Sequence, residues 1–229
     1  LHSFARPVLE NGEWKLFCEV EIEAYRDAEA VLSFDLALHT ASGTVPVHIE
    51  KSISLKKGFQ HDEETILLDD AAPLLWWPNG YGPQILHPLT ITLSVNGTAD
   101  DAVEHTVGFR TIEYRHADGR EDALPYNVVI NGKRIYLKGT NMVPLDCIHC
   151  TDEAVIRERL TAVHDANVNF LRIWGGGHLE SETYYHICDE LGLMILQEFT
   201  MSSSGCDDVP SRNPEFLKLL HEAAVYTIK

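Results

Sequence analysis

Apolar and polar side chains alternate through the first half of the chain. Every second residue is apolar in segments 14–25, 32–38 and 89–95, and weaker runs of this kind occupy 45–55, 65–68 and 103–114. A period of two with one polar face is typical of half-buried antiparallel strands. About seven short strands within roughly a hundred residues predict an immunoglobulin-like β-sandwich over residues 1–114.

The hydrophobic period changes in the second half. Segment 128–137 is predicted to be a hairpin with a type I′ turn at Asn131-Gly132, and we expect Asn96-Gly97 to be a similar turn rather than a glycosylation site. Segments 169–174 and 193–199 are predicted strands. Helices are predicted from a cap at Thr151 or Asp152 to about 167, from Ser181 to Gly192, and from Pro214 onward.

Strands that alternate with helices predict a parallel sheet in residues 115–229. The boundary falls in the charged linker near residues 114–124. Three strand–helix units leave the outer edges of a parallel sheet unpaired. From the pattern alone, this half is either a small three-layer α/β domain or the opening part of a larger one.

Composition and charge argue against several classes of binding partner. The net charge of −17 argues against binding a nucleic-acid backbone or an anionic membrane surface. No apolar run is long enough to span a bilayer, and the first residues do not resemble a signal peptide. Cys147 and Cys150 have zinc-like spacing, but no second pair follows, so we expect ordinary loop cysteines, no metal site and no cofactor.

The stretch LRIWGGGHLE, residues 171–180, contains the most distinctive candidate chemistry. A phosphate-binding loop is disfavoured because neither GxGxxG nor a following GKS or GKT is present. By strand parity Arg172 and Trp174 share a face, and near the carboxyl end of a parallel strand they would point into a pocket. A buried arginine paired with a carboxylate and a core tryptophan fit the same spacing equally well.

Several stretches, taken in order, resemble one known family. They are LLWWPNGYGPQILHPLTI (74–91), VGFRTIEY (107–114), VINGKRIYLKGTNMVPLD (129–146), NFLRIWGGGHLESETYYHICDELGLMILQEF (169–199) and NPEFLKLLHEAAVYTIK (213–229). This set resembles glycoside hydrolase family 2 and, within it, β-mannosidases. The resemblance implies an immunoglobulin-like sandwich followed by an incomplete (β/α)8 barrel of about three βα units.

The resemblance also implies a retaining exo-β-glycosidase that acts on oligosaccharides or glycans. Such enzymes use two glutamates on either side of the scissile bond. The family places them after the fourth and seventh barrel strands, so we expect neither in this chain. We therefore expect the 229 residues alone to be inactive, and the rest of a barrel or another chain to cover the exposed sheet edges. A non-catalytic carbohydrate-binding or scaffold module is the alternative from another class.

By resemblance, the sugar pocket would include Arg172, which family members place against the nucleophile, and Trp174, which lines the site for the terminal sugar. The glycines Gly175, Gly176 and Gly177, together with His178, would form a pocket loop. Asn141 and Asp146 are expected in the loop after the first strand and Glu198 at the tip of the third, all able to bind sugar hydroxyls. Glu198 could instead pair with Arg172.

Two departures from the β-mannosidase pattern lie near the expected pocket. Met142 stands where relatives usually have tryptophan, and His178-Leu179 replaces an Ile-Tyr pair. These differences leave β-galactosides or other β-glycosides open as substrates.

Overall fold

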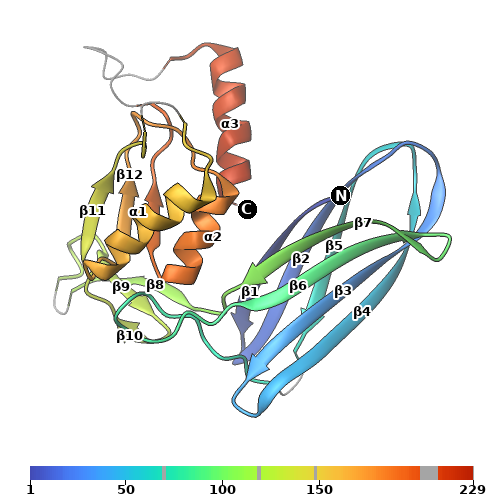
Figure 1. Ribbon diagram of the computed structural model, residues 1–229, viewed down its shortest axis with the longest axis horizontal. Helices are drawn as coiled ribbons and strands as arrows, with labels where there is room; N and C mark the ends of the chain where they lie inside the picture. Colours follow the sequence, from blue (N-terminus) through green and yellow to red (C-terminus); the bar gives the residue numbers. More distant parts are fainter. Residues whose placement is uncertain (69–70, 118–119, 147–148, 202–210, 229) are drawn as a thin grey trace. The chain divides into compact units, whose positions relative to one another are not determined.

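The computed structural model describes residues 1–68, 71–117, 120–146, 149–201 and 211–228 (Figure 1). The chain forms two compact units: Leu1–Trp77 with Pro83–Ile135, and Pro78–Gly82 with Tyr136–Lys229. The segment 115–135 thus lies in the first compact unit. Compact units are not domain limits, so the limits 1–114 and 115–229 stay a prediction.

The first unit contains two larger antiparallel sheets. One has the order β1-β2-β5, and the other has the order β4-β3-β6-β7 (Figure 1). The first sheet consists of β1 (His2–Glu10), β2 (Glu13–Ala24) and β5 (Gly58–Leu67), and the second of β3 (Ala28–Thr40), β4 (Gly43–Leu55), β6 (His87–Val95) and β7 (Thr98–Val107).

The apolar faces of these two sheets share one core. The alternating residues predicted to face inward on β2, β3 and β6 are almost all buried, and they belong to a single cluster with residues of β5 and β7. Leu16, Leu32 and Ile91 are each 0% exposed. Removing such side chains from water is the main favourable term in folding, so the period-two pattern accounts for the pairing of the two sheets.

A smaller sheet in the first unit has the order β10-β9-β8, with β8 (Ile112–Arg115), β9 (Asn127–Ile130) and β10 (Lys133–Arg134). The predicted turn between β9 and β10 is confirmed, because Asn131 and Gly132 have φ values of 50° and 77°. The Asn131 amide also donates to the Trp76 carbonyl at 2.9 Å. Trp76 is 2% exposed, which agrees with a packing role.

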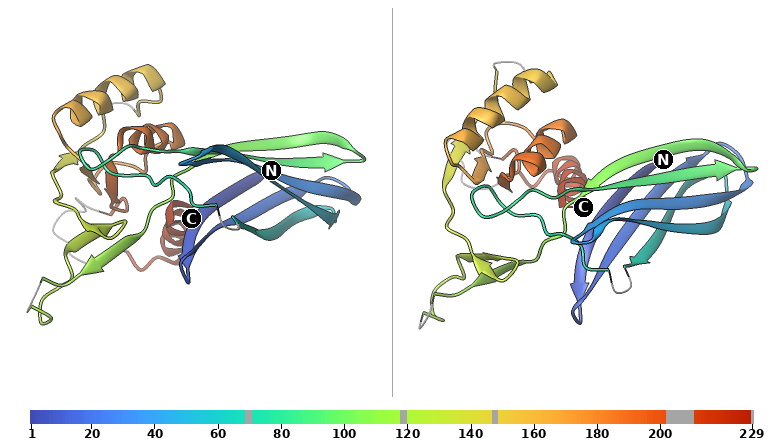
Figure 2. Two further views of the ribbon diagram at one scale, coloured as in Figure 1. Left: turned by 90° about the horizontal axis from the view of Figure 1, so that it is seen from below. Right: turned by 60° about the horizontal axis from the view of Figure 1, so that its bottom comes forward.

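The second unit contains a parallel sheet of order β11-β12-β13, formed by β11 (Gly139–Met142), β12 (Phe170–Ile173) and β13 (Met194–Gln197). Helix α1 (Glu153–Asp165) connects the first two strands, and α2 (Glu182–Leu191) connects the second and third. The two helices lie side by side (Figures 1 and 2). Helix α3 (Pro214–Ile228) follows β13 in sequence. None of the helices in the described residues is long and apolar enough to cross a membrane.

Local signals define the ends of α1 and α2 as predicted. The Asp152 side chain accepts hydrogen bonds from two backbone N–H groups of the first turn of α1, and the Ser181 hydroxyl does so once in α2. Such caps contribute about 1 kcal/mol each. Gly192 ends α2 with φ of 69°. Ile156 and Leu160 of α1 pack with β12 and α2 in a second core.

The motif LLWWPNGYG contributes to both units, since Pro78–Gly82 belongs to the second. The Asn79 backbone N–H donates to Gly192 O at 2.9 Å. Its side-chain amide donates to His164 O and Val168 O, each at 2.9 Å. Asn79 thus satisfies carbonyls at the carboxyl ends of both α1 and α2, groups that helices otherwise leave unpaired.

Candidate functional site

Strand parity determines the position of Arg172. Leu171 and Ile173 are 0% and 3% exposed and pack against α1 and α2. Because neighbouring side chains on a strand point to opposite faces, Arg172 lies on the other face of β12. This agrees with the face that strand parity predicted for Arg172.

Arg172 joins all three parallel strands through hydrogen bonds. Its Nε and Nη2 atoms lie 2.8 and 2.6 Å from Glu198 Oε1, directly after β13. Its Nη1 donates to Asn141 Oδ1 at 3.0 Å. Asn141 was predicted in the loop after the first strand, but it lies within β11, in register with Arg172. The parallel register brings the two residues side by side, which the loop assignment could not do.

Glu198 is held as an ionised acceptor. The Gly175 backbone N–H donates to its Oε2 at 2.9 Å. This bond, together with Arg172, lowers the pKa of the Glu198 carboxyl below its usual value. A carboxyl that remains ionised at neutral pH does not suit a general acid. Glu198 can instead accept hydrogen bonds from a ligand and orient Arg172.

The three consecutive glycines allow neighbouring atoms to pack closely, and they are not needed for a backbone with positive φ. None of them has a positive φ. A Cβ on Gly176 would lie 2.1 Å from Trp174 Cζ2, and one on Gly175 would lie 2.8 Å from the Phe199 carbonyl oxygen. At Gly176 the missing Cβ therefore leaves room for the Trp174 indole, which covers the backbone there.

A supporting layer behind Glu198 was not identified from the sequence. Gln197 Nε2 donates to the Glu198 carbonyl at 2.7 Å, and the Tyr185 hydroxyl donates to Gln197 Oε1 at 2.7 Å. The Glu180 backbone N–H in turn donates to Tyr185 at 3.3 Å. These bonds connect α2 to the tip of β13. Nothing in the local pattern distinguishes Gln197 from an ordinary residue at the end of a strand.

The remaining predicted residues lie on neighbouring segments. Asp146 is exposed on the segment after β11. His178 follows the glycines, and its ring contacts His149 with centroids 3.9 Å apart. Cys150 is a free, half-buried thiol, whereas Cys147, the other half of the CxxC spacing, lies outside the described residues.

Comparison with known proteins identifies the family. The model of the glycosyl hydrolases family 2 matches residues 2–110. The chain is 33% identical over 253 residues to a β-mannosidase of Mus musculus, an alignment that covers 96% of this chain and 28% of that protein. A β-mannosidase of Capra hircus is 33% identical over 177 residues, covering 74% of this chain and 20% of the relative.

Solved structures give the same result. The β-D-mannosidase of Dictyoglomus thermophilum superimposes with a TM-score of 0.79 at 27% identity, covering 98% of this chain and 26% of that one. An exo-chitosanase of Amycolatopsis orientalis shares the fold with a TM-score of 0.66 at 21% identity, covering 86% and 22%. The chain thus spans roughly a quarter of the length of these relatives. On this evidence the chain belongs to the glycosyl hydrolases of family 2.

Proposed function

We propose that these residues are the immunoglobulin-like sandwich and the first three βα units of a (β/α)8 barrel in a retaining exo-β-glycosidase. The proposed substrates are oligosaccharides or glycans with a terminal β-mannoside. The similarity to β-mannosidases over most of the chain supports this assignment. The parallel order β11-β12-β13, with a helix after each of the first two strands, is the arrangement that begins such a barrel.

The observation that carries the proposal is the network of Arg172, Glu198 and Asn141 at the carboxyl ends of adjacent parallel strands. In barrels of this kind, active sites occupy that end. The network presents charged and amide groups on the strand face opposite the helices, and the Trp174 indole, which lies over Gly176, would add a flat aromatic surface. Aromatic faces and convergent polar groups are the usual components of a sugar subsite.

The hydrogen-bond capacity of Arg172 leaves room for another partner. A guanidinium has five N–H donors, and the bonds to Glu198 and Asn141 within the described residues use three of them. We assign the others to the nucleophile carboxylate, which a neighbouring arginine would keep ionised. Trp174 would pack against the ring of the terminal sugar, and Glu198, Asn141 and Asp146 would accept or donate at its hydroxyls.

The two catalytic glutamates are proposed to lie outside these 229 residues. In a retaining enzyme they stand about 5 Å apart, one as acid/base and one as nucleophile. The lowered pKa of Glu198 argues against its serving as the acid. Hydrolysis by the 229-residue chain alone is therefore not expected.

The test is a panel of p-nitrophenyl β-glycosides given to the complete enzyme and to the 229-residue chain. We expect the complete enzyme to prefer the β-mannoside over the β-galactoside, β-glucoside, β-glucuronide and β-glucosaminide. Proton NMR should show the β-anomer of mannose as the first product, as retention requires. Preference for another glycoside would overturn the sugar assignment, and an α-anomer as first product would overturn the mechanism. Release of p-nitrophenol by the short chain would contradict the proposed location of the glutamates.

A further inference from the structure

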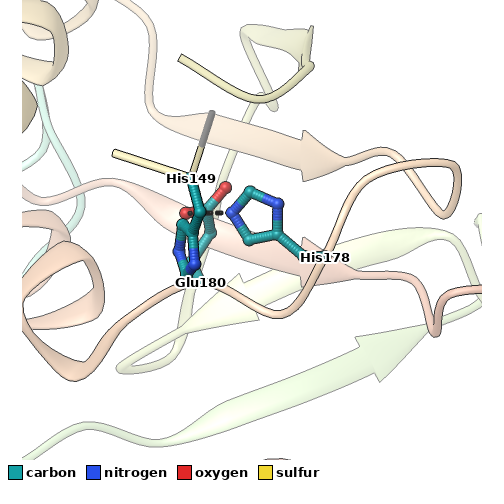
Figure 3. Close-up of side chains that lie close together, drawn as sticks. All are labelled: His149, His178 and Glu180. Carbon is teal, nitrogen blue, oxygen red and sulfur yellow. Dashed lines mark ion pairs between the residues drawn. The ribbon is translucent and has the colours of Figure 1, made fainter. Parts of the chain in front are cut away.

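His149, His178 and Glu180 come together beside the glycine loop, although 28 residues separate the first two in sequence (Figure 3). His149 lies on the segment after β11, and the other two follow β12. One ligand atom from each side chain lies within 4.8 Å of those of the other two. The two imidazole rings have centroids 3.9 Å apart and an interplanar angle of 53°.

Part of this cluster is buried and contains a ring nitrogen that makes no hydrogen bond with the described residues. The Glu180 side chain is only 7% exposed, and it forms an ion pair with His178. His178 Nε2 is a buried atom that makes no hydrogen bond with a described residue, and it lies 3.4 Å from Glu180 Oε2. A buried polar nitrogen without a hydrogen bond is costly.

We propose that His149, His178 and Glu180 bind a Zn²⁺ ion, with a fourth position open to water. Two imidazole nitrogens and one carboxylate oxygen are ligands that zinc accepts, whereas Mg²⁺ and Ca²⁺ prefer sites made of oxygen. Metal–ligand distances of about 2.0–2.1 Å place tetrahedral ligands about 3.4 Å apart. His178 and Glu180 already have that separation. His149 is exposed, so its side chain can rotate to shorten the longer distances.

The proposed ion would tie together the segments that follow β11 and β12. Those segments carry Pro144 and the glycine loop, which already contact each other at Gly177. Zinc would therefore stabilise the loop that supports Trp174. This proposal does not depend on the sugar assignment. It differs from the expectation that the chain has no metal site, because that expectation considered only the spacing of Cys147 and Cys150.

The test is a Zn²⁺ titration of the chelator-treated protein in competition with a chromophoric chelator. Wild type is compared with His149→Gln, His178→Gln and the control His186→Gln, whose histidine lies on α2 and pairs with Glu190. We expect either ligand variant to lose one bound equivalent and to weaken binding by more than about 100-fold, since even an outer-shell change costs about 10- to 100-fold. The control should keep wild-type affinity.

Cobalt substitution identifies the ligand atoms. We expect Co²⁺ to give the visible bands of a tetrahedral nitrogen–oxygen site, without thiolate charge-transfer absorption, and to lose these bands in His178→Gln. Several outcomes would overturn the proposal: unchanged binding in either ligand variant, equal loss in the control, or thiolate charge transfer, which would assign the metal to cysteines such as Cys150. Circular dichroism of each variant shows whether the protein is still folded when zinc binding is lost. Because His149 is exposed, His149→Gln is the ligand variant least expected to disturb the fold.

Discussion

The contact between Trp174 and Gly176 makes a specific prediction for Gly176→Ala. The new Cβ would lie 2.1 Å from Trp174 Cζ2 and 2.3 Å from Cη2. Carbon atoms in contact are normally about 3.5–4.0 Å apart, so the indole or the backbone must move by more than about 1 Å. Either response displaces the Trp174 indole from its place over Gly176.

The cost follows from the size of this clash. Forcing one extra methyl group into a packed site costs about 1–3 kcal/mol. The matched control is Gly177→Ala, where the new Cβ would meet Pro144 Cγ at 3.3 Å and a shift of a few tenths of an ångström suffices. We expect the control to cost less than about 1 kcal/mol.

A double-mutant cycle with Trp174→Ala isolates the contact. Hydrogen–deuterium exchange of the β12 and α2 amides measures opening of the second unit separately from the first. Gly176→Ala should lower this opening free energy by about 1–3 kcal/mol in wild type and by less than about 1 kcal/mol when Trp174 is already alanine. An equal cost in both backgrounds would refute the packing of the indole over Gly176.

Three further predictions concern the second unit and the thiols. Asn79→Ala should destabilise the second unit by about 1–3 kcal/mol, measured by the same exchange, because carbonyls at the end of α1 lose their donor; unchanged exchange would contradict this role. Arg172→Met should raise the pKa of Glu198 toward its usual value in a carboxyl NMR titration, and no rise would mean that the pair does not set it. Because the folded-state pKa is lowered, this carboxylate stabilises the protein above its unfolded pKa of about 4.3, and the contribution is lost as the pH falls through the lowered value. Iodoacetamide should modify Cys150 in the native protein but not Cys18 or Cys188. Burial raises the thiol pKa of Cys18 to about 12 and also raises that of Cys188, which protects both thiols. Native-state alkylation of either buried thiol would show that its strand or helix opens.

Elements with strong periodicity were predicted most directly from the sequence. Strands β2, β3 and β6 bury every second residue, so the apolar positions of their sequence pattern are the core positions. Strand β1 was missed because Ser3 is its only fully buried residue, and Pro7 and Arg6 interrupt the alternation. Its turn, Asn11-Gly12, has φ values of 54° and 86° and is the signal that could have identified it.

The same distinction holds at the candidate site. Parity alone predicted the face of Arg172, and its pairing with Glu198 was among the possibilities that the sequence left open. The register of β11 against β12, which places Asn141 beside Arg172, depends on tertiary structure. The approach of His149 to His178 also depends on it, because their segments follow different strands. Spacing along the chain carries no information about such contacts.

Trp174 is proposed to line the sugar subsite of a β-glycosidase, and kcat/KM for p-nitrophenyl β-D-mannoside measures its contribution. In the proposed complete enzyme, Trp174→Ala should lower kcat/KM by about 10- to 100-fold, equivalent to about 1.4–2.8 kcal/mol of transition-state stabilisation. Phe59→Ala, which removes an aromatic ring that is 83% exposed in the first unit, should stay within about twofold of wild type. Equal kcat/KM for Trp174→Ala and wild type would show that Trp174 does not line this subsite.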